Sequence, residues 1–417
     1  MSNLSFSSAL RALSNRDYRL FFFGQGASLI GTWMQSIAAS WLIYSLTGSP
    51  FMLGLAGFLG QIPVFLISPV AGVLGDRWSR HRILLIVQIM SMIQAFVLAA
   101  LTLCGVVQVW HILVLTGILG IINAFEMPVR QAFIIEMIKD RDELPNAIAL
   151  NSSVFNASRL IGPAVAGVVV AAAGEGVCFL INGLSYIAVI AAFLSMNVTP
   201  VIIEKTGKNV FADMKDGFSY ALGFVPIRDI LTLIALISLF GMTFPVLLPV
   251  FAAKVFGGGS HTFGILVSAS GAGAFLATIY LAMRKSLQGQ GVIMNIAVYT
   301  FAVSLMAFAY SDIFLLSTLL LVVIGFSMIV VVASCNMVLQ AVVEEGKRGR
   351  VMSFYIMAFT GAAPVGSLLA GSLSSKAGAP LTVFICGCAC LLLAAAFSFR
   401  LPAVRVLVRE AISRGKG

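Results

Sequence analysis

The sequence predicts an all-α membrane protein in which twelve transmembrane helices form two six-helix halves. Three observations carry this prediction: the composition, the number of long apolar stretches, and the distribution of basic residues between them. Of the 417 residues, 60% are hydrophobic and 10% are charged, whereas water-soluble domains carry about 25% charged residues. The apolar stretches are continuous, which indicates helices rather than the short alternating strands of a membrane barrel.

Twelve apolar stretches are each long enough to cross a bilayer. Their approximate limits are 19–45, 51–75, 83–103, 110–137, 146–172, 177–197, 229–253, 262–284, 292–310, 313–341, 350–374 and 380–400. The six cysteines lie in or beside these stretches, and the three histidines are scattered. No spacing typical of a disulfide framework, a metal site, a nucleotide-binding loop or a catalytic triad is present. We therefore expect no enzyme, no catalytic residue, no metal and no cofactor.

Lysine and arginine are concentrated in alternate connections between these stretches. Only Lys254 and Lys376 fall in the loops on one side, and the other loop lysines and arginines share a side with both chain ends. Basic loops stay in the cytoplasm, so we expect both termini to be cytoplasmic. The first fifteen residues lack a compact apolar segment, which predicts a retained end rather than a signal peptide. Attraction to an anionic leaflet explains the net charge of +10, so no nucleic-acid partner is expected.

One long polar connection divides the chain. Residues 198–228 separate the sixth and seventh stretches, and Phe211, Met214, Phe218 and Leu222 recur there at helical spacing. This pattern predicts an amphipathic helix on the inner membrane surface. The predicted parts are a six-helix half over 1–197, a cytoplasmic linker over 198–228, a second six-helix half over 229–400 and a basic cytoplasmic tail over 401–417. Weak similarities between the halves indicate two related repeats, as in many secondary transporters.

A dense charged segment, GVLGDRWSRHR at 72–82, lies between the second and third stretches. Its single acid, Asp76, follows the C-terminal end of a helix, where negative charge is unfavourable. We therefore expect a partner for it elsewhere, either an arginine on the fourth stretch or the basic start of the eleventh stretch at Arg348 and Arg350. The predicted cytoplasmic gate comprises Gly72, Gly75, Asp76, Arg77, Arg80, Arg82, Arg348 and Arg350. Alternatively, the arginines of this segment only fix the topology.

The segment resembles the signature loop of the major facilitator superfamily, in which it latches the two halves on the cytoplasmic side. Ser79 and His81 depart from the usual pattern. The stretches 20–50, 127–167 and 348–371 resemble one bacterial branch, the drug:proton antiporters that include enterobactin exporters and macrolide efflux proteins. The resemblance implies the major facilitator fold, the bacterial inner membrane and protons as coupling ion. The substrate does not follow from it, because this branch exports chemically unrelated compounds. Polar side chains near mid-depth, with Phe, Met and Trp nearby, fit a small amphipathic molecule better than a sugar. We expect a monomer.

Three charged residues are predicted near the middle of the bilayer. Glu126 and Arg159 lie at similar depths on the antiparallel fourth and fifth stretches, and Arg130 follows Glu126 by one turn. A charge at this depth requires a partner or a wet cavity, so we expect Glu126 and Arg159 to meet. They form either a proton-coupling network or a permanent salt bridge. Proton coupling follows mainly from the resemblance, because the first stretch has no acid beyond Asp17.

Two further sets of residues complete the expected site. Gly162, Pro163 and Gly167, in RLIGPAVAG, resemble the antiporter motif of the fifth helix and would permit a bend or close helix packing. Polar side chains near mid-depth form the expected substrate cavity: Thr32, Trp33, Gln35, Asn123, Asn156, Thr243, Asn336 and Thr360. Each of these cavity residues could instead make an ordinary hydrogen bond between helices.

The sequence thus predicts a secondary transporter working by alternating access, and a proton-coupled exporter of drugs, siderophores or metabolites in particular. A lysolipid or lipid transporter, or an uptake carrier, of the same fold is the alternative. A membrane-embedded enzyme or sensor is a distant one, because no convergent catalytic groups and no output domain are visible.

Overall fold

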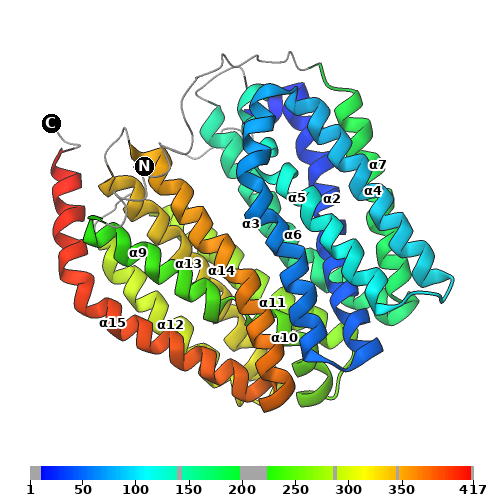
Figure 1. Cartoon of the computed structure of the whole chain (residues 1–417). Coiled ribbons are helices and arrows are strands. Elements are labelled where there is room, and N and C mark those ends of the chain that lie inside the picture. The colour runs from blue at the N-terminus through cyan, green and yellow to red at the C-terminus, as the bar shows by residue number, and fades with distance from the viewer. Residues whose placement is uncertain (1–10, 139–142, 198–222, 285–288, 344–346, 415–417) are drawn as a thin grey trace. The chain divides into compact units, whose positions relative to one another are not determined.

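The computed structural model describes residues 11–138, 143–197, 223–284, 289–343 and 347–414. The side chains of residues 72–77, 349, 401, 403–405 and 407–414 lie outside this description. Every regular element within the described residues is a helix, and none of these residues forms a strand (Figure 1). The predicted all-α fold class is therefore confirmed.

The chain divides into two compact units by its internal contacts. Unit 1 comprises Met1–Gly48, Leu59–Glu204 and Gly258–Ser268, and unit 2 comprises Ser49–Phe58, Lys205–Gly257 and Ala269–Gly417. The units differ from the predicted halves in two places, because the first turns of one helix in each half belong to the other unit. The predicted amphipathic helix of the linker falls mostly within 198–222, outside the described residues.

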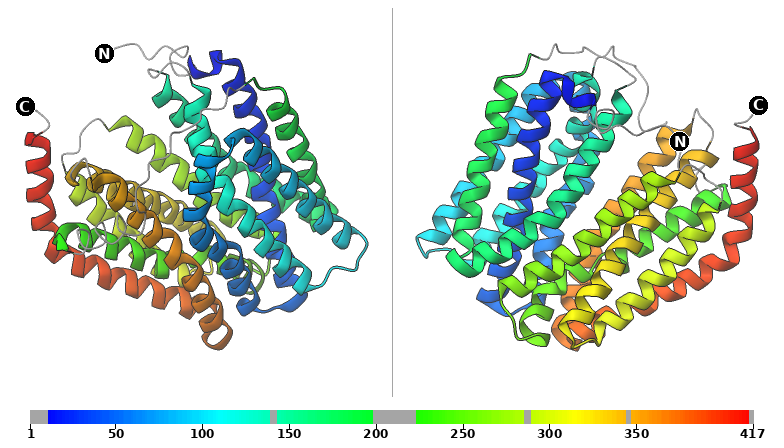
Figure 2. Two further views of the ribbon diagram at one scale, coloured as in Figure 1. Left: turned by 45° about the horizontal axis from the view of Figure 1, so that its top comes forward. Right: turned by 180° about the vertical axis from the view of Figure 1, so that it is seen from behind.

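Unit 1 is a bundle of long helices. Its elements are η1 (Arg11–Ser14), α2 (Arg16–Thr47), α3 (Pro50–Arg77) from Leu59 onward, α4 (Arg80–Leu103), α5 (Val109–Met137), α6 (Leu144–Ala173) and α7 (Glu175–Leu194). α2 packs against α6 and α7, and α4 packs against α5 and α7. Figures 1 and 2 show these helices lying side by side. Its core is a cluster of apolar side chains that includes Phe21, Phe133 and Phe193.

Local sequence signals set the ends of α2. The side chain of Asn15 accepts hydrogen bonds from the backbone N–H groups of Asp17 and Tyr18 at 3.0 and 3.3 Å. It therefore satisfies two donors that the first turn of a helix leaves without partners. The helix ends at Gly48, whose φ of 60° is a left-handed conformation that glycine adopts without strain.

Unit 2 is also built of long helices. Its elements are α9 (Val225–Leu236), η2 (Ile237–Gly241), α10 (Phe244–Val250), η3 (Phe251–Val255), α11 (Ser260–Met283) from Ala269 onward, α12 (Gln290–Ala309), α13 (Phe314–Val342), α14 (Arg348–Ala377) and α15 (Ala379–Arg414). α12 packs against α13 and α15, and α14 packs against α9, η2 and α15. The predicted seventh stretch is thus interrupted, since two π-helical turns flank the proline-containing α10.

Eleven helical segments of the described chain are long and apolar enough to cross a membrane. The long helix missing from these eleven is α2, which carries polar residues such as Gln25 and Gln35 in its middle. Large apolar side chains such as Leu315 and Leu392 are exposed on the outside of the helices, as expected for surfaces in contact with lipid. The chain is therefore a multi-pass membrane protein. α15 continues past the predicted span to Arg414, so part of the predicted tail is helical.

Candidate functional site: the polar interior of unit 1

α2 brings the polar side chains of unit 1 together. It packs against α5, α6 and α7, and polar groups lie along its buried faces. Gln25 and Gln35 are each only 3% exposed. Because burying an amide without partners is costly, the contacts of these side chains define the site.

Glu126 on α5 lies beside Gln25, the first of the two buried glutamines of α2. The Gln25 side-chain nitrogen donates a hydrogen bond to Glu126 Oε1 at 3.3 Å. Arg130, one turn further along α5, forms an ion pair with the same oxygen at 3.7 Å. Two polar atoms of this cluster, Gln25 Oε1 and Arg130 Nε, are buried without a hydrogen-bond partner among the described residues. The cluster therefore has an unused acceptor and an unused donor for a water or a substrate group.

Arg159 on α6 lies beside a different residue of α2, Trp33. Its guanidinium carbon is 5.9 Å from the centroid of the Trp33 ring, which is a cation–π distance. The ring of Phe155 meets that of Trp33 edge-on at 6.3 Å. Within the described part of the chain, no carboxylate lies within 4.0 Å of Arg159.

The expected contact between Glu126 and Arg159 is therefore wrong for this structure. Glu126 meets α2 at Gln25 and Arg159 meets it at Trp33, eight residues further along the same helix. α2 packs against both of the helices that carry these charges and provides a separate partner for each of them.

The other expected cavity residues of unit 1 differ in their surroundings. Gln35 donates to Gln94 Oε1 of α4 at 2.9 Å and accepts from Asn182 Nδ2 of α7 at 2.8 Å. Thr32 bonds the hydroxyl of Tyr186 at 3.2 Å. These contacts tie three or more helices together. Sequence reasoning did not single out Gln94 and Asn182, although each is an amide inside an otherwise apolar stretch.

Asn156 of α6 and Asn123 of α5 are the remaining expected cavity residues of unit 1. The Asn156 amide donates to the Ser152 carbonyl of its own helix at 2.9 Å. Asn123 is half-buried one turn before Glu126, and its side chain has no hydrogen-bond partner among the described residues. The amide of Asn123 is therefore free to bind a ligand beside the charged cluster.

The candidates in unit 2 lie in separate local environments. Thr243, at the break between η2 and α10, is buried and donates to the Phe240 carbonyl at 2.7 Å. Asn336 of α13 accepts a hydrogen bond from Gln340. Thr360 of α14 donates to the Ile356 carbonyl at 2.8 Å. A cavity role for these residues remains a prediction.

The glycines of the fifth predicted stretch are sites of close helix packing in unit 1. A Cβ atom added to Gly162 would lie 2.5 Å from Trp33 Cβ, so no side chain fits between α6 and α2 there. Further along α6, a Cβ on Gly264 of α11 would lie 2.6 Å from the Pro163 carbonyl oxygen and 2.9 Å from Gly167 Cα. Small residues are required at both crossings.

Unit 2 contains a similar crossing that the sequence did not reveal. A Cβ on Gly54 of α3 would lie 2.5 Å from the Ser367 carbonyl oxygen and 2.9 Å from Gly371 Cα of α14. The glycines themselves are the only sequence signal for this crossing. That signal is weak, because glycine is common in membrane helices.

The predicted gate is described only in part. Gly72, Gly75, Asp76 and Arg77 belong to the end of α3, but their side chains lie outside the described ones. Arg80 forms an ion pair with Glu136 of α5 at 2.7 Å, a partner that sequence reasoning missed. Arg82 and Arg348 are exposed, and Arg350 is half-buried. In the described part of the chain, no three His, Cys, Asp or Glu side chains gather as a metal site would require.

Comparisons with known proteins agree with this architecture. A family model described as "transmembrane secretion effector" matches residues 7–414. The staphyloferrin A transporter of Staphylococcus aureus is 26% identical over 382 residues, covering 91% of this chain and 95% of that one. The multidrug efflux pump Tap of Mycolicibacterium fortuitum is 23% identical over 401 residues, covering 93% and 96%.

Solved transporter structures share the fold at lower identity. The nucleoside transporter NupG superposes with a TM-score of 0.73 at 16% identity, covering 93% of this chain and 98% of that one. Macrolide efflux protein A of Streptococcus pyogenes is 26% identical over 199 residues, covering 46% of this chain and 47% of that one. The chain is thus a transporter rather than an enzyme, and it belongs to the transmembrane secretion effector family of the major facilitator superfamily.

Proposed function

We propose that this transporter is a proton-coupled exporter of small amphipathic molecules, working by alternating access in the bacterial inner membrane with both termini in the cytoplasm. The observation that carries the proposal is the cluster of Gln25, Glu126 and Arg130. Glu126 is the single acid in the middle part of any predicted stretch, which makes it the natural proton site. Ionisable residues at this depth are rare and typically functional.

The geometry favours a titrating role for Glu126 over a permanent brace. Its ion pair with Arg130 joins two residues of one helix, so the pair ties no two helices together. The carboxylate and the guanidinium are 15% and 12% exposed, which leaves both accessible to water. A carboxylate that can lose its partner and take up a proton is what proton coupling requires.

The residues around Trp33 of α2 offer a binding position for an amphipathic substrate. Arg159 presents hydrogen-bond donors, while Trp33 and Phe155 present aromatic surface. Asn123 adds an amide near Glu126. Polar groups beside aromatic rings suit a molecule with both polar and apolar parts. The names of two relatives support export, since one is called a multidrug efflux pump and the other a macrolide efflux protein.

The proposal is tested with the full chain in proteoliposomes carrying an imposed pH gradient, a pH-sensitive dye inside, and a panel of dyes, macrolides and siderophores. We expect substrate movement accompanied by proton counterflow, and Glu126→Gln should abolish the dependence on the gradient. Glu136→Gln is the matched control, because Glu136 lies on the same helix but pairs with Arg80. Substrate movement that ignores the gradient, or a Glu126→Gln variant that still follows it, would refute proton coupling through Glu126.

A further inference from the structure

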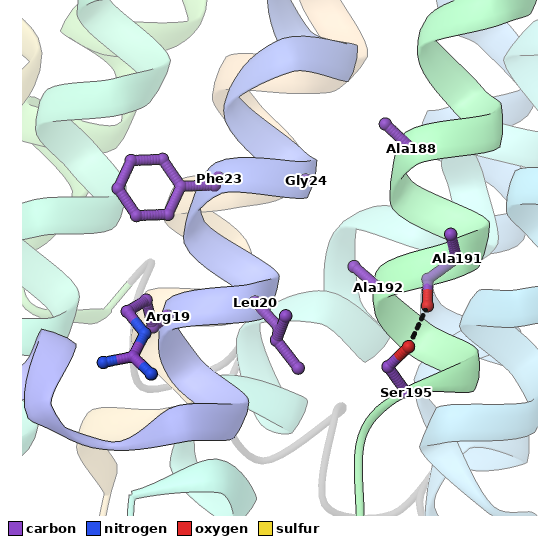
Figure 3. A pocket seen from close by; sticks show the side chains of 8 residues that line it. All are labelled: Arg19, Leu20, Phe23, Gly24, Ala188, Ala191, Ala192 and Ser195. Carbon is purple, nitrogen blue, oxygen red and sulfur yellow. Dashed lines mark hydrogen bonds between the residues drawn. The ribbon is translucent and has the colours of Figure 1, made fainter.

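A groove lies on the outside of unit 1, where α2 begins and α7 ends. Eight residues line it, as Figure 3 shows: Arg19, Leu20, Phe23, Gly24, Ala188, Ala191, Ala192 and Ser195. Its volume is about 520 Å³. The hollow exists because the residues that line it from α7 are three alanines and a serine, and Gly24 faces them from α2.

This groove opens toward the surroundings of the bundle rather than toward the charged cluster. Phe23 is 64% exposed, whereas Gln25, two residues later, is buried against Glu126. Residues two apart on a helix point about 200° apart, so the groove and the cluster lie on opposite faces of α2. A groove on the outer face of a transmembrane helix is in contact with lipid.

The positive charge of Arg19 favours lipids with an anionic headgroup. Arg19 lines the groove, is exposed, and forms no ion pair with any described residue. The nearest acid in the sequence, Asp17, accepts a hydrogen bond from the backbone N–H of Asn197 at 3.3 Å. Arginine binds phosphate groups well because its planar donors match the phosphate oxygens. The groove therefore combines one exposed arginine with a mostly apolar lining that contains several small residues.

We propose that this groove binds an anionic phospholipid, with its phosphate at Arg19 and an acyl chain along Gly24, Ala188 and Ala191. A second copy of the chain fits less well, because a two-fold interface through this patch would bring the Arg19 side chains of both copies together. The proposal does not depend on the transported substrate or on proton coupling.

The test is native mass spectrometry of the full chain released from mixed micelles with equal amounts of phosphatidylglycerol and phosphatidylethanolamine. We expect preferential retention of phosphatidylglycerol. Arg19→Gln should lower the retained ratio about fivefold, since one arginine near an anionic surface contributes about 1 kcal/mol. Ala191→Leu should fill the groove and reduce retention of both lipids, and Ala188→Leu repeats this test if the first variant folds poorly.

Two matched controls make the test specific. Arg16→Gln removes a neighbouring exposed arginine that does not line the groove, and Ala171→Leu adds the same bulk to an exposed position on α6. Both should retain the wild-type lipid ratio and amount. The proposal fails if Arg16→Gln lowers the ratio as much as Arg19→Gln, because diffuse surface charge would then suffice. Equal retention of the two lipids by the wild type, unchanged retention in both leucine variants, or a dimer that Ala191→Leu dissociates would also overturn it.

Discussion

The guanidinium carbon of Arg159 lies 5.9 Å from the centre of the Trp33 ring, so a charge deep in the bundle is held by an aromatic face. Such a contact contributes about 1 kcal/mol or more when it is partly desolvated. Glu126 meets a different residue of the same helix, Gln25. The contact with Trp33 thus joins α6 to α2 through a charged side chain.

Trp33→Leu and Arg159→Met should each lower the thermal melting temperature of the purified transporter, and the double variant should fall by less than their sum. The reason is that the second substitution has no cation–π contact left to remove. The cycle is measured by temperature-dependent size-exclusion chromatography in detergent. Trp41→Leu is the control, because Trp41 stacks on Phe263 and not on Arg159. Additive effects of Trp33→Leu and Arg159→Met would show that the contact contributes nothing.

Gln35→Leu should destabilise the protein, because it removes the partner that two other buried amides share. The Gln94 acceptor and the Asn182 donor would each lose a hydrogen bond, at about 1–3 kcal/mol for a buried group left unsatisfied. We expect a lower melting temperature in detergent for this variant.

Asn123→Leu is the control for that prediction, since Asn123 has no hydrogen-bond partner among the described residues. It should leave the melting temperature nearly unchanged and alter transport instead. If Asn123→Leu destabilises the protein as much as Gln35→Leu does, the distinction between a structural amide and a ligand-binding amide is wrong.

The length and order of the helices could be predicted from the sequence because long apolar stretches have few alternatives in a bilayer. The stretch predicted at 110–137 is α5 over Val109–Met137, for example. α2 was also predicted, as the stretch 19–45, although Gln25 and Gln35 make it too polar to qualify by hydropathy alone. The polar groups that weaken the hydropathy signal are the ones that form the site.

Contacts between charged residues were harder to predict. Counting residues gives the depth of Glu126 and Arg159 along their own helices, but it does not show that α2 provides partners to both. The partnership of Arg80 with Glu136 was missed for a related reason, because helix packing and not sequence distance brings α4 and α5 together. Gly54 was missed because a close helix crossing depends on the partner helix, which the sequence of α3 does not specify.

Gly54→Val should destabilise unit 2. Its new Cβ would lie 2.5 Å from the Ser367 carbonyl oxygen and 2.9 Å from Gly371 Cα, which forces α3 and α14 apart. Overpacking of this kind costs about 1–3 kcal/mol, and we expect a lower melting temperature and weaker transport. Gly117→Val is the control, because a Cβ on Gly117 meets nothing within 4 Å. Equal tolerance of the two substitutions would mean that the crossing can relax freely.

Asp76→Asn tests the proposed cytoplasmic gate. If Asp76 holds the cytoplasmic side closed in the outward-open state, its neutralisation should shift the population toward states with an open cytoplasmic side. A cysteine introduced as Ser153→Cys, at an exposed position on α6, should then react faster with a charged maleimide added to the cytoplasmic face. The Cys104→Ser background removes the exposed native thiol. Arg16→Gln, which neutralises an exposed arginine outside the predicted gate, should leave the rate unchanged. An unchanged rate for Asp76→Asn would mean that the charged segment fixes topology without latching the transporter, whereas a rise only in that variant would assign the latch to its carboxylate.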